Sequence, residues 1–319
     1  MMIPLDAIRR AREILDGVAT RTPLVRLTAP DSPGEIYLKL ENLQPIGSFK
    51  IRGAYNAIFQ ASPESRARGV VTASAGNMAQ GVAFAARLLG LEATVIVPES
   101  APQTKVAAVE RLGGKVVKVS YDRWWQSIQE SRFDEVSGLF VHPVLDDPVM
   151  AGNGTIGLEV LEDLPRPSTI LIPWGGGGLA SGIASAVRAL APQTKIFAVE
   201  VETAAPLTAS WKAGSPQAIV PQPSFVDGIG GKSVLPKMWP LAQELLDGVL
   251  TVSLEEVASA VRFLAERARV IAEGAGAAPV ALALSGRAGG GKIVCVVSGG
   301  NIDFSRLAPI LLGRESTPL

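Results

Sequence analysis

The stretch Ile172-Pro173-Trp174-Gly175-Gly176-Gly177-Gly178-Leu179-Ala180-Ser181-Gly182 decides the fold class. It joins a short apolar run, Thr169–Ile172, to an amphipathic run, Ala180–Leu190. Consecutive glycines allow the backbone to come close to a ligand, and the amide groups at the start of a helix attract an anion. The stretch therefore predicts a strand, a phosphate-binding loop and a helix in succession.

The same glycines permit two other interpretations. The spacing of Gly175, Gly177 and Ala180 fits the G-x-G-x-x-A pattern of dinucleotide-binding loops. Glu200 ends the next predicted strand, where a ribose-binding acid would lie. A glycine-rich turn that only eases packing of the helix on the sheet is the remaining interpretation. A Walker-type loop is disfavoured because no G-K-[ST] follows the glycines.

Outward from this loop, short apolar runs alternate with amphipathic runs. Runs of Val, Ile and Leu bounded by Gly or Pro are typical of strands buried on both faces, so the alternation predicts an α/β fold with mainly parallel sheets. Ligands of such sheets bind beyond the carboxyl ends of the strands. We expect strands at Ile36–Leu40, Val70–Thr72, Ala93–Val97, Lys115–Val119, Gly138–His142, Thr169–Ile172, Lys195–Val201 and Lys292–Val297. We expect helices at Gly53–Gln60, Ala79–Leu89, Gln103–Leu112, Gly157–Leu161, Ala180–Leu190 and Leu254–Ala268.

Composition excludes several classes of protein. Hydrophobic residues make up 47% of the 319 residues and charged residues 19%, which excludes a disordered chain. The 30 Lys and Arg balance the 30 Asp and Glu, so nothing indicates a nucleic-acid partner. Cys295, the single cysteine, cannot form an internal disulfide. His142, the single histidine, excludes most His-based zinc sites and Ser-His-Asp triads.

The chain shows no sign of a membrane partner. Met1–Leu15 alternates apolar and charged residues and has no apolar core of signal-peptide type. The longest uncharged stretch, Pro167–Val187, contains Pro173 and the four glycines, which disfavour a spanning helix. We therefore expect a cytoplasmic protein.

A second motif, Ser48-Phe49-Lys50-Ile51-Arg52-Gly53, predicts the start of another helix. Ser48 is expected to cap this helix and to place Lys50 in its first turn. The positive end of the helix dipole and the apolar neighbours Phe49 and Ile51 would then lower the pKa of Lys50. A neutral lysine amine is what Schiff-base chemistry requires. The alternative is a surface lysine beside a capped helix.

A third motif, Thr72–Gly81, again predicts a strand, a loop of small residues and a helix. Its small residues and helix-start amides suit a carboxylate or another anion. The alternative is a helix that has only Ser74 or Asn77 as its cap. Two further loops, Glu273–Ala277 and Val297–Asp303, are either part of the same site or simple connections.

Together these stretches resemble the serine/threonine dehydratase family of pyridoxal-phosphate (PLP) enzymes, which have fold type II, similar to the tryptophan synthase β-subunit. The resemblance runs from about Thr22 to Asp303. It implies two doubly wound, mainly parallel α/β domains with PLP in the cleft between them. Residues 1–68 and 147–319 would form the large PLP-binding domain, and residues 69–146 a small mobile domain. The motifs that carry the resemblance are Lys39–Pro45, Gly47–Ala54, Ser74–Gly81, His142–Pro148, Gly175–Gly178, Asp227–Ile229 and Ser298–Asn301.

The resemblance also implies a role for each matching residue, and it favours the phosphate of PLP as the ligand of the glycines. Lys50 would hold PLP and remove the Cα proton, and Ser74 is the other candidate catalytic residue. Around the cofactor, Phe49 and Gly228 would flank the ring, Asn77 would bind its phenolic oxygen, and Ser298 would face the pyridine nitrogen. The phosphate would be held by Gly175, Gly176, Gly177, Gly178 and Leu179. Glu273 would be a further cofactor-binding residue. The substrate carboxylate would lie against Ser74, Ala75, Gly76, Asn77 and Met78.

The implied activity is that of an ammonia-lyase. β-Elimination from a small-molecule substrate, a β-hydroxy-α-amino acid, would give a 2-oxo acid and ammonia. The substrate would be L-threonine or L-serine, or a bulkier amino acid such as L-phenylserine. The alternatives are a β-replacement enzyme of cysteine-synthase type, a nicotinamide-dependent dehydrogenase that uses Gly175–Ala180, and a catalytically silent relative that binds an amino acid. The family's usual state is a homodimer.

Several residues depart from the family pattern. Ala75 stands where serine racemases of the family carry a second catalytic serine, so we expect elimination without substantial racemisation. Met78 replaces a usual histidine and Trp174 a usual small residue, and Trp124 and Trp125 lie in a region that helps to form the substrate side of the cleft in relatives. These larger side chains either make the pocket more apolar or only repack the interior.

A divalent-cation site of some relatives is incomplete here. Glu200 and the carbonyl of Ala204 match two of its ligands, but the third, an aspartate, is Pro206, which offers no side-chain oxygen. We therefore expect no metal.

Overall fold

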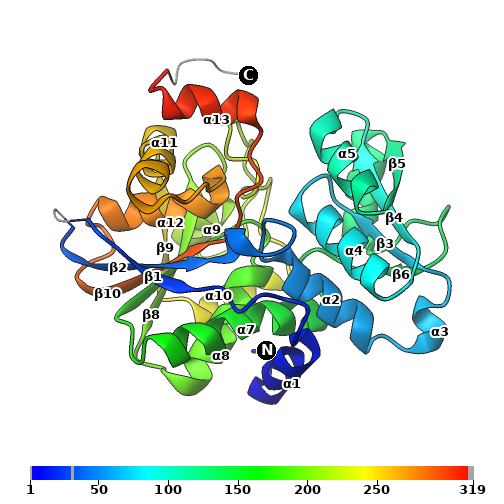
Figure 1. Cartoon of the computed structure of the whole chain (residues 1–319), viewed down its shortest axis with the longest axis horizontal. Coiled ribbons are helices and arrows are strands. Elements are labelled where there is room, and N and C mark those ends of the chain that lie inside the picture. Colours follow the sequence, from blue (N-terminus) through cyan, green and yellow to red (C-terminus); the bar gives the residue numbers. More distant parts are fainter. Residues whose placement is uncertain (1, 30–31, 315–319) are drawn as a thin grey trace.

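A computed structural model describes residues 2–29 and 32–314, and two sheets organise them (Figure 1). The larger sheet has the strand order β1-β2-β10-β7-β8-β9, and the smaller has the order β5-β4-β3-β6. Neighbouring strands are parallel except β1, which is antiparallel to β2. The strands are β1 (Leu24–Leu27), β2 (Gly34–Leu40), β3 (Val70–Ala73), β4 (Ala93–Pro98), β5 (Lys115–Val119), β6 (Leu139–Phe140), β7 (Thr169–Pro173), β8 (Lys195–Val201), β9 (Gly248–Val252) and β10 (Gly291–Val297).

Helices cover both faces of each sheet, which confirms the predicted α/β fold. On the larger sheet, α1, α7, α8 and α10 share one hydrophobic core, and α11, α12 and α13 share the other. On the smaller sheet, α4 and α5 pack on one face and α6 on the other. The helices are α1 (Leu5–Leu15), α2 (Lys50–Gln60), α3 (Pro63–Arg66), α4 (Asn77–Leu88), α5 (Gln103–Arg111), α6 (Tyr121–Glu130), α7 (Asp147–Asp163), α8 (Gly178–Leu190), α9 (Pro206–Ala213), α10 (Met238–Leu245), α11 (Leu254–Phe263), α12 (Gly274–Leu284) and α13 (Phe304–Leu311), with a 3₁₀ turn η1 (Glu41–Leu43) and a π-helical turn η2 (Leu264–Ala268).

All eight predicted strands are present. One of them was predicted too long, and one predicted helix was too short. The strand expected at Gly138–His142 is only Leu139–Phe140, because the chain turns at His142 toward α7. The helix expected at Gly157–Leu161 is the middle of α7, which is buried on all sides from Val149 to Val160. A helix that is buried all round has no polar face, so its periodicity does not mark its ends.

Pairing of β2 with β10 places two distant loops side by side. The strands end together, with Leu40 opposite Val297. Beyond them, the amide of Phe49 donates to the carbonyl of Ser298 at 3.0 Å. The loop after β10 is thus joined to the segment that starts α2, which puts Lys50 close to Ser298. In the described chain no helix is long and apolar enough to cross a membrane.

Candidate active site

A cavity of about 300 Å³, here called the inner pocket, opens where strands of the two sheets end. Loops that follow β3, β7 and β10 line it together with the start of α2, as the rule for open parallel sheets predicts. All residues that the resemblance assigned to catalysis, cofactor binding or substrate binding contribute to its wall: Phe49, Lys50, Ser74, Ala75, Gly76, Asn77, Met78, Gly175, Gly176, Gly177, Gly178, Leu179, Gly228, Glu273 and Ser298.

Lys50 is the first residue of α2 and thus lies in its first turn, as predicted, and it lines the inner pocket. Its Nζ donates to the carbonyl oxygen of Pro143 at 3.2 Å and lies 5.1 Å from the ring centre of Phe49. Burial lowers the pKa of Lys50 to about 8, and the nearby carboxylate of Glu273 raises it in part. A substantial fraction of this amine is therefore neutral near physiological pH.

The prediction that Ser48 caps α2 is wrong. No side chain caps this helix, and the buried Oγ of Ser48 has no hydrogen-bond partner among the described residues. Ser48 instead forms an isolated β-bridge with Gly299. Ser48 thus pairs the segment before α2 with the loop that follows β10.

A buried ion network holds the first turn of α2. Arg52 contacts Glu41 at 2.8 Å and Glu159 of α7 at 2.6 Å, and Lys39 contacts Glu159 at 2.5 Å. These four side chains are almost completely buried. Removal of one partner from such a network leaves an uncompensated charge, which typically costs about 3–5 kcal/mol. The network therefore fixes the helix that carries Lys50.

The four glycines form a cradle between β7 and α8. Gly177 precedes α8 with φ of +96°, a left-handed conformation that favours glycine. A Cβ on Gly176 would collide with the side chain of Val144, and one on Gly178 would come within 3.0 Å of its carbonyl oxygen. In the described chain, no protein acceptor is found for the amides of residues 175–178. Free amides at a helix N-terminus fit a phosphate group.

The three tryptophans lie in different surroundings. Trp124, on α6, lines the inner pocket, but Trp125 and Trp174 do not. Trp174 is 1% exposed and packs its indole against Gly177 beneath the cradle. Of the two interpretations, Trp174 therefore fits the one in which it repacks the interior, because its side chain belongs to the core.

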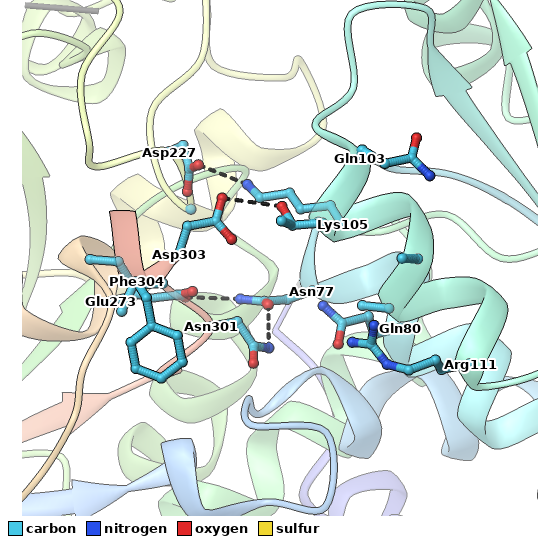
Figure 2. A pocket seen from close by; sticks show the side chains of 16 residues that line it. Asn77, Gln80, Gln103, Lys105, Arg111, Asp227, Glu273, Asn301, Asp303 and Phe304 are labelled. Atoms are coloured by element: carbon cyan, nitrogen blue, oxygen red, sulfur yellow. Dashed lines mark hydrogen bonds and ion pairs between the residues drawn. The ribbon is translucent and has the colours of Figure 1, made fainter. Parts of the chain in front are cut away.

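A chain of polar contacts crosses the site from α4 to α12 (Figure 2). Asn77 Nδ2 donates to Glu273 Oε1 at 2.8 Å, and Asn77 Oδ1 accepts from Asn301 Nδ2 at 2.8 Å. Burial and the charge of Asp227 raise the pKa of Glu273 to about 7. Neither Ser74 nor Asn77 caps α4, because Gly76 holds that position without a side chain. The Asn77 side chain thus faces the site.

Beyond this chain lies a second cavity of about 540 Å³, here called the outer pocket (Figure 2). Lys105 pairs with Asp227 at 2.7 Å, and Thr104 donates to Asp303 at 3.1 Å, so α5 is tied to two loops of the larger sheet. Two groups at the site, Lys105 and the carbonyl of Pro143, are not predictable from the sequence. Lys105 belongs to no glycine loop, and a backbone carbonyl carries no signal of its own.

Glu200 accepts three hydrogen bonds from the start of α9. Its Oε1 accepts from the amide of Leu207 at 2.9 Å, and its Oε2 accepts from the amide and hydroxyl of Thr208 at 2.7 and 2.8 Å. The carboxylate therefore caps α9, which begins at Pro206. Among the described residues no cluster of three or more His, Cys, Asp or Glu could hold a metal ion.

Comparison with known proteins decides which cofactor the site accepts. The family described as "Pyridoxal-phosphate dependent enzyme" matches residues 15–299. The chain belongs to this family. This PLP-dependent enzyme is 42% identical over 316 residues to the L-threonine ammonia-lyase of Thermotoga maritima, a match that covers 97% of this chain and 78% of the relative.

Two further relatives agree. The L-threonine dehydratase catabolic TdcB of Staphylococcus aureus (strain N315) is 38% identical over 319 residues, with 97% of this chain and 92% of the relative covered. The structure of maize serine racemase superimposes with a TM-score of 0.88 at 33% identity and covers 98% of each chain. The expected fold type and cofactor of this PLP-dependent enzyme are thereby confirmed, and the dehydrogenase alternative is overturned.

The residues present fit PLP. The cradle offers unpaired amides to the phosphate, and Lys50 offers an amine in the same cavity. Gly228 lines the same cavity with its backbone and has no room for a side chain, since a Cβ there would come within 2.9 Å of Ala275 Cβ and 3.2 Å of Glu273 Oε1. Ser298, which is 3% exposed, lines the same wall.

Proposed function

We propose that this enzyme is an ammonia-lyase that converts a β-hydroxy-α-amino acid to a 2-oxo acid and ammonia. The observation that carries the proposal is the meeting of three elements in the inner pocket: the amine of Lys50, the glycine cradle, and the loop from Ser74 to Met78. The threonine ammonia-lyase and threonine dehydratase relatives support the same reaction class.

PLP, when bound, withdraws electrons from the Cα of the amino acid and makes its proton acidic. In this proposal the amides that begin α4 hold the substrate carboxylate, since the first amides of a helix lack partners within it. Lys50 Nζ takes the Cα proton as a neutral amine, which its lowered pKa of about 8 favours. The electron pair left at Cα forms a Cα–Cβ double bond while the Cβ–O bond breaks, and the β-hydroxyl leaves as water with a proton that balances the one taken by Lys50. Once released, the enamine becomes an imine, and water adds to its Cα and expels ammonia to give the 2-oxo acid.

The cofactor roles suggested by the resemblance are part of the same proposal. Phe49 and Gly228 would hold the ring, Ser298 would bind the pyridine nitrogen, and Asn77 would bind the phenolic oxygen. A serine hydroxyl leaves that nitrogen largely unprotonated, which weakens the electron sink and favours elimination. The buried carboxylate of Glu273, held by Asn77, completes this side of the pocket.

The visible absorption spectrum of the purified protein tests the proposal. We expect a yellow protein whose band is lost in Lys50→Ala, and release of 2-oxo acid when serine, threonine or phenylserine is added. A colourless protein that cannot be reconstituted with PLP would overturn it. A yellow protein that forms no 2-oxo acid from any of the three would overturn the reaction class.

Trp124 favours a bulkier substrate within this class. Trp124 and Met78 both line the inner pocket, and because Met78 is only 2% exposed, the apolar surface comes mainly from the indole of Trp124. We propose that a β-aryl substituent, as in phenylserine, packs on this indole. Trp124→Ala is then expected to lower kcat/KM for phenylserine by about 2–10-fold, the value of one aromatic pair, and to leave serine unaffected.

Trp125→Ala is the matched control, because Trp125 neighbours Trp124 without lining the pocket. It should leave both substrates unchanged. A wild-type kcat/KM for serine or threonine that equals or exceeds that for phenylserine would count against the bulky substrate and leave threonine or serine as the natural one.

We also propose that residues 69–146 move as a small domain against residues 1–68 and 147–319. The smaller sheet lies wholly within 69–146, and the pairs Lys105–Asp227 and Thr104–Asp303 join the two parts at the mouth of the site. Such closure would exclude water during the reaction. Light scattering with and without substrate would report the compaction.

Finally, we propose a homodimer in the cytoplasm. Leu43, Ile271 and Phe304 are large apolar side chains that are 51%, 42% and 84% exposed. Asn42 is hydrogen-bonded to the carbonyl of Ile271, so Leu43 and Ile271 are neighbours. Exposed apolar groups that gather on one face are typical of an interface. Sedimentation of the wild type and of Phe304→Ser would test the assignment.

A further inference from the structure

His142 has no part in the proposed chemistry, yet it is completely buried next to the inner pocket. It lies between β6 and α7, and its exposed fraction is 0%. The two residues that follow it, Pro143 and Val144, both line the inner pocket. Buried polar groups are almost always hydrogen-bonded, so the two ring nitrogens of His142 are expected to have partners.

The hydrogen bonds of His142 fix its tautomer. Nδ1 lies 3.0 Å from the amide nitrogen of Val144 and 2.9 Å from that of Leu145. Backbone amides only donate, so Nδ1 accepts and carries no proton. The proton is therefore on Nε2, which donates to the carbonyl of Ile128 on α6 at 3.1 Å. Burial lowers the pKa of His142 to about 4, which keeps the ring neutral.

These bonds bend the chain into a tight turn. Nδ1 draws in two successive amides, and the amide of His142 itself donates to Asp146 Oδ2 at 2.8 Å. Lys237 supports the turn from outside through the carbonyl of Leu145 at 2.8 Å. As a result the carbonyl of Pro143 points at Lys50.

We propose that His142 is a positioning residue for Lys50: it holds the Pro143 carbonyl as the hydrogen-bond acceptor of the free Lys50 amine. The carbonyl takes one N–H of Lys50 at 3.2 Å and so restricts the directions in which the lone pair can point. It also stabilises the ammonium form that results when Lys50 takes a proton. The inference goes beyond the proposed function and rests on it only for the role of Lys50 in turnover.

A direct acid–base role for His142 is excluded by its geometry. Both ring nitrogens are engaged with backbone groups, and the ring has no exposed surface. A group that exchanges protons with a substrate must come within hydrogen-bond reach of it. His142 therefore acts through the backbone of Pro143.

Two substitutions separate the bonds of His142. The Oδ1 of asparagine can take the place of Nδ1, so His142→Asn keeps an acceptor for the two amides and loses the bond to Ile128. The amide nitrogen of glutamine can take the place of Nε2, so His142→Gln keeps the donor to Ile128 and loses the acceptor. Both substitutions replace a buried ring by a smaller amide side chain, so each variant is a control for the other.

The readout is the pKa of Lys50 in the apoprotein. We would follow modification of Lys50 by a small amine-reactive anhydride across pH, with quantification of the peptide by mass spectrometry. The charges near Lys50 are unchanged in both variants: Glu273 and the Lys105–Asp227 pair on the pocket side, and Lys237 with Asp146 around the turn. Thermal melting of both variants reports whether they fold.

We expect His142→Asn to keep the wild-type midpoint near pH 8 and His142→Gln to lower it by about 0.5–1 pH unit, the effect of one lost hydrogen bond to the ammonium group. In the reconstituted enzyme, His142→Gln should lower kcat by about 3–10-fold with KM nearly unchanged. Identical midpoints in folded wild type, Asn and Gln variants would overturn the proposal. The labelling needs neither cofactor nor substrate, so a failure of the proposed function would not mimic this result.

If both variants unfold, the ¹⁵N spectrum of His142 in the wild type provides the test. Because His142 is the only histidine, its ring gives a single pair of ¹⁵N resonances. We expect the neutral tautomer with the proton on Nε2, unchanged from pH 5.5 to 8.5. A proton on Nδ1, or titration near pH 6.5, would overturn the assignment of Nδ1 as the acceptor that shapes the turn.

Discussion

The indole of Trp174 lies against Gly177, so close that a Cβ atom on Gly177 would come within 2.5 Å of Trp174 Cη2. Gly177 also has φ of +96°. The phosphate cradle is thus held from below by an aromatic ring that leaves no room for a side chain, and its conformation suits glycine alone among the common residues.

Gly177→Ala is therefore expected to disturb the cradle. The left-handed conformation costs about 1–2 kcal/mol and the collision with Trp174 about 1–3 kcal/mol, so the free energy of unfolding should fall by about 2–5 kcal/mol. We expect PLP affinity to fall by about tenfold or more, as the amides turn away from the phosphate. Chemical denaturation of the apoprotein and titration with PLP measure the two effects.

Gly17→Ala is the control. Gly17 has φ of +70° with no atom within 4 Å of a built Cβ, so it carries the backbone cost without the collision. Its loss of stability should stay near 1–2 kcal/mol, with PLP affinity unchanged. Equal losses in the two variants would show that Trp174 does not brace the cradle.

Most of the site was predictable because its signals are local. Glycines at a strand end and a lysine at a helix start are visible in the sequence whatever the rest of the chain does, so the cradle and Lys50 were placed correctly. The helix positions that failed, as in α7, failed because burial on every face removes the amphipathic period.

Features that depend on tertiary contacts were not predictable. The direction of the Trp174 side chain depends on what packs behind the cradle. The consecutive residues Trp124 and Trp125 do not show in the sequence which of them faces the pocket, and only Trp124 lines it. The pair Lys105–Asp227 joins residues 122 positions apart. Such a contact follows from the meeting of two sheets, which no local pattern describes.

Glu200 should act as a helix cap that needs no cation. Activity is expected to be unchanged by EDTA and by added Mg²⁺. Glu200→Gln should lower the free energy of unfolding by about 1–2 kcal/mol, as other lost caps do, to the same extent with and without Mg²⁺. Melting curves under both conditions measure this.

Thr208→Val is the matched variant, since it removes one of the three hydrogen bonds to Glu200 and leaves the carboxylate in place. Its loss of stability should be smaller than that of Glu200→Gln. Loss of activity on chelation, restored by Mg²⁺, would show instead that this carboxylate binds a cation despite Pro206.

Glu273 should control the protonation of Lys50. The carboxylate stabilises the ammonium form and so raises the pKa of Lys50 against the larger effect of burial. Glu273→Gln removes that charge, and the midpoint of Lys50 labelling should move below pH 8, because the ammonium form loses a stabilising carboxylate and the amine stays neutral down to a lower pH. The same labelling of the apoprotein measures the shift.

Asp227→Asn is the control for this effect. Asp227 raises the pKa of Glu273 but makes no resolved contribution to that of Lys50. Because Glu273 is then ionised at a lower pH, the Asp227→Asn variant should leave the Lys50 midpoint at pH 8 or slightly above it, never below. A midpoint that stays at 8 in Glu273→Gln, or moves upward, would contradict the assigned coupling.

Ala75 should restrict the enzyme to elimination. It lines the inner pocket in the loop before α4, beside Ser74. Return of a proton to the face of Cα opposite Lys50 requires a group that can carry one, and a methyl group cannot. We expect wild-type enzyme to release 2-oxo acid from L-serine with D-serine below about 1% of turnover, measured by chiral chromatography.

Ala75→Ser adds a hydroxyl at this position and should make D-serine formation detectable, while 2-oxo acid formation persists. Ala75→Val adds bulk without a proton donor and should form no D-serine, so it separates the chemistry of the hydroxyl from a change in pocket shape. If the wild type forms D-serine at a rate close to that of 2-oxo acid, another group must deliver the proton. The nearest hydroxyl to examine would then be that of Ser74, whose Oγ accepts from the amide of Gly76 at 3.3 Å and could still donate to substrate.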